Sequence, residues 1–186
     1  MEFATTQAVR RFTAAEVERM LQVGIVGEDE PVELLEGVLE AVPPPSVDHA
    51  RRLHVIEGEL QAAYGPTHAV LCQKPVDAHK DSRPKPDIAV LRAPAAHYRR
   101  ELPTGADTIL VVEFSVNSLE RDHRKARLYA LAGVPVLWIV DVRGRRLEVH
   151  SDPGPEGYGA LSVLGEADEV LLPETALRWT VVVLLP

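Results

Sequence analysis

The 186-residue chain has one cysteine, only four lysines among its 20 basic residues, and no apolar run of membrane-spanning length. The lone Cys72 cannot form an internal disulfide, which favours a reducing, cytoplasmic compartment. No run approaches the roughly 18 residues that cross a bilayer, and the start, MEFATTQAVRRF, lacks the apolar core of an export signal. The sequence therefore predicts neither membrane insertion nor secretion.

Positive charge is also scarce, because the net charge is −8 at pH 7. This balance argues against a protein that coats nucleic acid with its whole surface, so any polyanion must bind at a local patch. The composition, 46% hydrophobic and 26% charged, is that of a globular protein. With no internal repeat and no low-complexity segment, residues 1–186 are predicted to form one domain.

The first half of the chain predicts two helices separated by a hairpin. A capping box at Thr13 and Glu16 begins a helix that runs to about Gly24, and residues 32–43 form two short strands turning at Glu36-Gly37. A second helix follows, capped by Ser46 or Asp48 and stopped at residues 65–66, with an apolar stripe at three- and four-residue spacing.

The second half predicts a sheet. Residues 68–76, 86–92 and 108–116 are short apolar segments typical of strands, and Asn117 or Ser118 opens a helix over 119–132. Residues 136–141 form a strand that is apolar on both sides and therefore central. The tail is expected to add strands, with a turn at residues 152–155 and a last strand over 178–186. This order predicts an α/β fold with a central mixed sheet flanked by helices.

Two carboxylates stand out because charged residues rarely lie between apolar strand residues without a partner. Asp87 opens one predicted strand and Glu113 ends the apolar run of the next. If these strands are neighbours, the two carboxylates converge and offer the hard oxygen ligands that Mg²⁺ or Mn²⁺ requires. Strand alternation places Ser115 on the same face as Glu113. Lys125, in the basic run 121–127, can reach this point from the following helix.

These residues resemble a known family. The order ELLEG, PKPDIAVL and LVVEFSVNSLERDHRKARLYALAGVPVLWIVD, over residues 33–141, is similar to the Uma-two family of restriction-endonuclease-like proteins within the PD-(D/E)xK nuclease superfamily. The matching positions are Glu33 with Gly37, Pro86-Asp87, Glu113 with Ser118, Asp122 with Lys125, and Tyr129-Ala130 with Gly133-Val134.

The resemblance implies a restriction-endonuclease-like fold and metal-dependent cleavage of phosphodiester bonds, with DNA as the expected substrate. It implies that Asp87 and Glu113 bind Mg²⁺ or Mn²⁺ and that Lys125 stabilises developing negative charge. The chain departs from the superfamily at Ser115, where the strand lysine is expected, so Lys125 must substitute from the helix. Glu33 is either a third acidic contributor or a strand-edge charge paired with an arginine.

Alternatives remain open at this point. The chain is a magnesium-dependent endonuclease, an inactive relative of that fold that binds nucleic acid or a protein, or a metal hydrolase with an enclosed site for a small substrate. The seven histidines show no HxxxH spacing, so no zinc site is predicted. Tyr129 and Trp138 are expected in the core. The apolar tail WTVVVLLP predicts a covered sheet edge or the seam of a homo-oligomer, a dimer in the simplest case.

Overall fold

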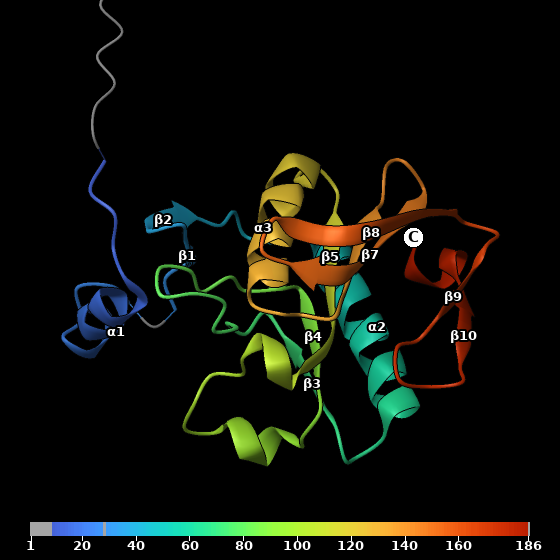
Figure 1. Cartoon of the computed structure of the whole chain (residues 1–186), viewed down its shortest axis with the longest axis horizontal. Coiled ribbons are helices and arrows are strands. Elements are labelled where there is room, and N and C mark those ends of the chain that lie inside the picture. The colour runs from blue at the N-terminus through green and yellow to red at the C-terminus, as the bar shows by residue number, and fades with distance from the viewer. Residues whose placement is uncertain (1–8, 28, 186) are drawn as a thin grey trace, which may run out of the picture.

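A mixed sheet of six strands forms the centre of the computed structural model, which describes residues 9–27 and 29–185 (Figure 1). Its spatial order follows the chain: β3 (Ala69–Cys72), β4 (Ile88–Leu91), β5 (Thr108–Ser115), β6 (Val136–Asp141), β7 (Arg146–Gly154) and β8 (Gly157–Gly165). Neighbouring strands are antiparallel except β5 and β6, which are parallel and joined by a helical crossover. The predicted α/β fold with a central mixed sheet is confirmed, and β6 lies inside the sheet as expected.

Helices cover both faces of this sheet. α2 (Val47–Tyr64) packs on one face against the side chains of Val112 and Phe114, while α3 (Leu119–Leu131) covers the other face, where Val111 lies. Because successive strand residues point to opposite faces, Glu113 must face α3. The helix that carries Lys125 therefore covers the strand that carries Glu113.

A smaller cluster lies beside the sheet, where α1 (Ala14–Gln22) packs against the hairpin of β1 (Val32–Leu35) and β2 (Val38–Ala41) (Figure 1). The predicted capping box of α1 is present, with the Thr13 hydroxyl accepting from the Glu16 N–H and the Glu16 carboxylate accepting from the Thr13 N–H. The hairpin turns at Glu36-Gly37, both with positive φ, and a side chain at Gly37 would collide with Arg11. Residues 32–41 thus fold as the sequence predicted.

The tail differs from the prediction in two places. The turn between β7 and β8 comes after Gly154, later than the predicted residues 152–155. The pairing of β7 with β6 ends at Ser151. Pro153, which has no N–H, can therefore continue β7 without the loss of a hydrogen bond to β6. The second error concerns the predicted last strand over 178–186: of its described residues, 178–185, only β10 (Arg178–Thr180) is a strand, paired with β9 (Glu169–Leu171).

A 3₁₀ turn, η3 (Val181–Leu184), replaces the rest of the predicted last strand. It buries Val181 and Leu184, three residues apart, and leaves Val182 and Val183 about half exposed. The homo-oligomer expected from this segment stays a prediction. Two further 3₁₀ turns, η1 (Ala95–Tyr98) and η2 (Gly105–Asp107), lie between β4 and β5.

The helices do not have the character of membrane spans. Among the described residues, none combines the length and the apolar composition needed to cross a bilayer. Residues 1–8, on which the expectation of no export signal partly rests, lie outside the described residues. Cys72 is a partly buried residue of β3, and burial raises the pKa of its thiol to about 12.

Candidate active site

Asp87 and Glu113 lie together where β4 and β5 run side by side. Asp87 directly precedes β4, and the pairing of Ile88 with Val112 places it next to Glu113. The Asp87 N–H lies 3.4 Å from Glu113 Oε2, and the Phe114 N–H donates to Asp87 Oδ2 at 2.8 Å. The structure thus brings together the two carboxylates that the sequence singled out.

Lys125 enters the same site from α3. Its Nζ lies 2.6 Å from Glu113 Oε1 and donates to the carbonyl of Lys85 at 3.1 Å. The lysine and Glu113 side chains are each only 4% exposed, so this ion pair is almost fully withdrawn from water. Tyr129, one helical turn later, donates its hydroxyl to the same Glu113 oxygen at 2.6 Å. Tyr129 is buried as predicted, but its hydroxyl contacts the site as well as the core.

Glu33 reaches the site from β1. It lies 3.5 Å from Lys125 Nζ and 3.1 Å from Arg121 Nη2, and its side chain is as buried as that of Lys125. Both sequence-based interpretations therefore describe part of its environment, because it pairs with an arginine and also belongs to the acidic cluster. Ion pairs of Glu33 with Arg121 and of Glu40 with Arg124 connect the hairpin to α3 on this side of the site.

Two further residues contribute to the site, and neither was assigned a role from the sequence: His49, and Asp122, which was named only as a position of the family pattern. His49, near the start of α2, places Nε2 3.1 Å from Asp87 Oδ1, and this hydrogen bond raises the pKa of the imidazole. Asp122 is buried, accepts from the Ser118 hydroxyl at 2.7 Å, and has a carboxyl pKa raised by that burial. Asp122 stands three residues before Lys125, a spacing that places both on one helix face.

The charges around this site do not balance. When ionised, the carboxylates outnumber the permanent cations, and His49 adds a positive charge only when it is protonated; the groups are Glu33, Asp87, Glu113, Asp122, Lys125 and Arg121. Burial raises the pKa of Glu113 above its usual range, against the opposing effect of Lys125. Burial would lower the pKa of Lys125, but the charges of Glu113 and Glu33 outweigh it, so that the ammonium titrates above its usual range. Such a site favours added positive charge.

The donor set fits a hard divalent cation. Asp87 and Glu113 present carboxylate oxygens from adjacent strands, which are the ligands that Mg²⁺ and Mn²⁺ prefer.

An open hollow of about 330 Å³ adjoins the site at the start of α3. It is lined by Asn117, Ser118, Glu120, Arg121 and Arg124. Ser118 and Arg121 also contact the buried acids Asp122 and Glu33, so the hollow and the site share side chains. This arrangement differs from the enclosed pocket expected of a small-substrate hydrolase.

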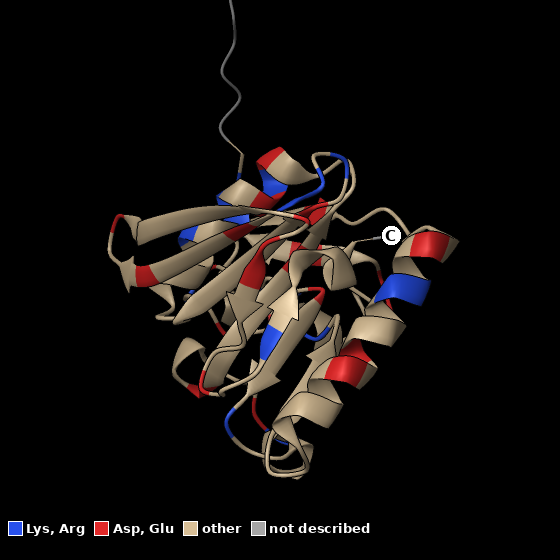
Figure 2. Ribbon diagram, turned by 90° about the vertical axis from the view of Figure 1, so that its right-hand side faces the viewer, with Lys and Arg blue, Asp and Glu red and all other residues tan. Residues whose placement is uncertain are grey.

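Basic residues are otherwise dispersed. In the orientation of Figure 2, acidic and basic residues of the described chain are interspersed along the ribbon, and the basic ones form no continuous stripe. This distribution agrees with the net charge of −8, which predicts a local contact with any polyanion. The two arginines at the hollow are candidates for such a contact.

Comparison with known proteins gives a consistent result. The family model Uma2, described as "Putative restriction endonuclease", matches residues 14–184. Among solved structures, the chain is similar to "a putative nuclease belonging to DUF820" from Anabaena variabilis ATCC 29413, with a TM-score of 0.74, 17% identity, and coverage of 93% of this chain and 97% of the other. At this identity the structural likeness shows the fold alone. No curated protein matches the chain.

Proposed function

Since the chain belongs to the Uma2 family, described as "Putative restriction endonuclease", we propose that it is a metal-dependent endonuclease that hydrolyses phosphodiester bonds in DNA. The observation that carries this proposal is the convergence of Asp87, Glu113 and Lys125 from two strands and a helix. Carboxylates that share a site with a buried lysine suit phosphodiester hydrolysis, in which negative charge develops on the phosphate.

Asp87 and Glu113 would hold Mg²⁺ or Mn²⁺ between them. When bound, the cation lowers the pKa of water and offsets charge on the phosphate. Asp87 is held in place for this role by the Phe114 N–H and by His49, which fixes the carboxylate from the α2 side. Tyr129 and Lys125 both engage Glu113 Oε1, which leaves Oε2 on the side of Asp87.

Lys125 would stabilise the developing charge. Its three N–H groups face Glu113, the Lys85 carbonyl and Glu33, and the Glu33 contact at 3.5 Å is the longest of the three. A phosphate oxygen can replace Glu33 at the ammonium, because Glu33 keeps Arg121 as a partner. Glu33 then acts as a positioning residue that holds Lys125 until substrate arrives.

The hollow at α3 would receive the DNA backbone. Arg124 is about half exposed and pairs with Glu40 in a bidentate contact, the geometry in which arginine also binds phosphate. Helix N-termini favour anions, and the first turns of α3 line this hollow. The arginines of this hollow would give DNA a local basic contact on a chain whose net charge is −8.

Digestion of DNA tests the proposal. Plasmid, linear duplex and single-stranded DNA are incubated with the full chain and Mg²⁺ or Mn²⁺, alongside Asp87→Asn and Lys125→Met. Glu59→Gln, an exposed carboxylate change on α2, is the matched control. We expect cleavage by the parent and by Glu59→Gln, loss of cleavage in Asp87→Asn and Lys125→Met, and no cleavage with a chelator.

The alternative functions give different results. An inactive DNA-binding relative would shift DNA in a gel, with no cleavage by any variant and no change of affinity in Asp87→Asn. Cleavage that survives in Asp87→Asn as strongly as in Glu59→Gln would show that the activity arises elsewhere. The first result would overturn the proposed nuclease activity, and the second would overturn the assignment of Asp87 to the active site.

A further inference from the structure

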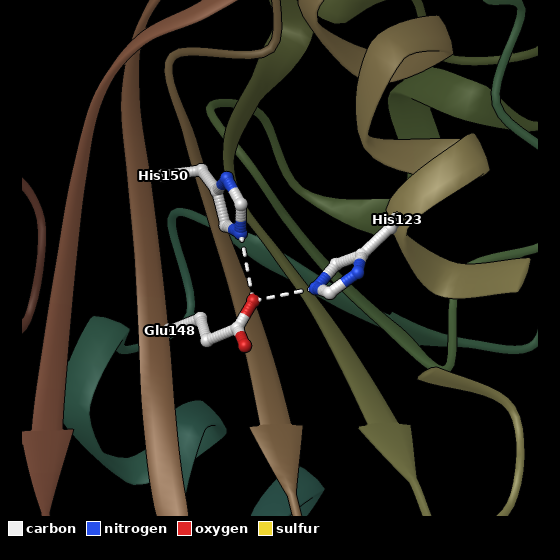
Figure 3. Close-up of side chains that lie close together, drawn as sticks. All are labelled: His123, Glu148 and His150. Atoms are coloured by element: carbon white, nitrogen blue, oxygen red, sulfur yellow. Dashed lines mark hydrogen bonds and ion pairs between the residues drawn. The ribbon is translucent and has the colours of Figure 1, made fainter. Parts of the chain in front are cut away.

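Three metal-ligating side chains meet on the face of the sheet near β8, away from the acidic site. His123 points from α3 toward Glu148 and His150, which lie two residues apart on β7 and so on one face of that strand (Figure 3). His123 Nε2 lies 2.7 Å and His150 Nε2 3.4 Å from the same oxygen, Glu148 Oε2. All three ligand atoms lie within 4.8 Å of one another, and no other such trio occurs among the described residues.

This trio is separate from the Asp87 and Glu113 site. His123 and Lys125 are two residues apart on α3 and therefore differ by about 200° around the helix axis. Lys125 faces β5 and the hairpin, whereas His123 faces β7. None of the contacts that hold the acidic site involves these three residues.

We propose that His123, Glu148 and His150 form a second metal site, one for Zn²⁺ or a similar imidazole-seeking divalent ion. Two imidazoles and one carboxylate are a ligand set that binds zinc with a fourth position left for water. The acidic site offers only oxygen ligands and suits Mg²⁺ or Mn²⁺, so the two sites differ in metal preference. The new site does not depend on the proposed nuclease activity.

The geometry needs only a small adjustment to accept the ion. Bonds of about 2.0–2.1 Å to zinc place tetrahedral ligands roughly 3.3 Å apart, so the imidazoles must approach by about 1.5 Å at most. Glu148 and His150 are nearly buried and fixed on β7, whereas the His123 side chain is 46% exposed and has room to turn. The metal would replace the proton that His123 and Glu148 share in their hydrogen bond.

A hollow of about 400 Å³ opens over the trio and gives access from solvent. Glu156 and Arg127 also line this hollow, and the positive charge of Arg127 opposes a bound cation. Arg146 also opposes a cation, with Nη2 3.7 Å from Glu148 Oε1, but it has Asp141 as a closer partner at 3.0 Å. The carboxylate oxygen between the imidazoles is therefore free of a close arginine.

Zinc titration tests this inference without any need for nuclease activity. The full chain is stripped with a chelator and studied in the Asp87→Asn background, which weakens metal binding at the acidic site. Calorimetry with Zn²⁺ should give one equivalent per chain, and Co²⁺ should give the visible absorption of a four-coordinate ion. His123→Ala should weaken the affinity by about 100-fold or more, since even indirect contacts to metal ligands contribute 10–100-fold.

Matched variants make the test decisive. His54→Ala removes an exposed histidine from α2 and should leave zinc binding unchanged. Glu148→Gln keeps the shape of the carboxylate, removes its charge and should weaken zinc as His123→Ala does. The proposal is wrong if the stripped chain takes up no zinc, or if His123→Ala and Glu148→Gln bind it as tightly as His54→Ala.

Discussion

Replacing Lys125 by Met probes the buried pair at the centre of the acidic site. Methionine has a similar length and fits an apolar environment, so the main effect is the loss of the ammonium. Glu113 would then keep the Tyr129 hydroxyl but no cation, and Glu33 would keep Arg121. Breaking a buried ion pair by removing one partner costs about 3–5 kcal/mol, because it leaves an uncompensated charge.

The stability that Lys125→Met removes should depend on whether Glu113 carries a charge. Glu113→Gln keeps a hydrogen-bonding side chain but removes the charge, so a second replacement of Lys125 by Met leaves no buried charge on Glu113. Replacing a whole buried pair with neutral groups is often neutral for stability. We therefore expect Lys125→Met to cost about 3 kcal/mol or more in the parent chain and roughly 1 kcal/mol in the Glu113→Gln background.

Urea unfolding measures this coupling, with the fluorescence of buried Trp138 as one probe and circular dichroism as another. The free energies of unfolding of the parent, the two single variants and the double variant form a double-mutant cycle. Equal losses from Lys125→Met in both backgrounds would refute the reasoning. So would a loss below about 1 kcal/mol in the parent, which is the value typical of a solvent-exposed pair.

Three other predictions concern separate parts of the chain. Cys72, with its thiol pKa raised by burial to about 12, should react with alkylating reagents far more slowly in the folded chain than in urea at pH 8, and its rate should still rise between pH 9 and 11. Ser46→Ala should lower the free energy of unfolding by about 1 kcal/mol in thermal or urea denaturation, because the Ser46 hydroxyl caps α2 at the His49 N–H. Arg124→Ala should reduce the slope of log DNA affinity against log salt by about 0.9, and an unchanged slope would exclude a phosphate contact there.

The strands and the central pair of acids could be predicted because their signals are local. Short apolar segments bounded by turns fix β4 and β5, and a carboxylate at Asp87 or Glu113 is conspicuous among apolar neighbours. Their proximity follows once the strands are neighbours. The capping box of α1 and the glycine turn of the hairpin are local as well, so the predicted bounds of α1 and the hairpin agree with the structure.

The contacts that the sequence did not reveal all join segments far apart in the chain. His49 reaches Asp87 only because α2 packs beside β4, and His123 meets His150 only because α3 crosses β7. The spacing rule for histidine ligands within one helix therefore could not detect the trio on α3 and β7. The final 3₁₀ turn was not predicted for a related reason. The residues Val181–Leu184 are all apolar and typical of a strand, and only the tertiary packing, which buries Val181 and Leu184, shows the three-residue period of the turn.

Because the lysine of the acidic site lies on α3 and not on the strand, its position depends on how α3 packs against the sheet. Ser115, two residues after Glu113, lies near the Ser118 hydroxyl that binds Asp122, while Lys125 supplies the ammonium from the helix. A lysine on the strand would be fixed by the sheet itself, but Lys125 is placed only as well as α3 is docked. His123 on the same helix contacts β7, so a metal bound by the trio would add a link between α3 and the sheet. Zinc should then protect the α3 amides from hydrogen exchange in the parent chain and leave them unprotected in His123→Ala.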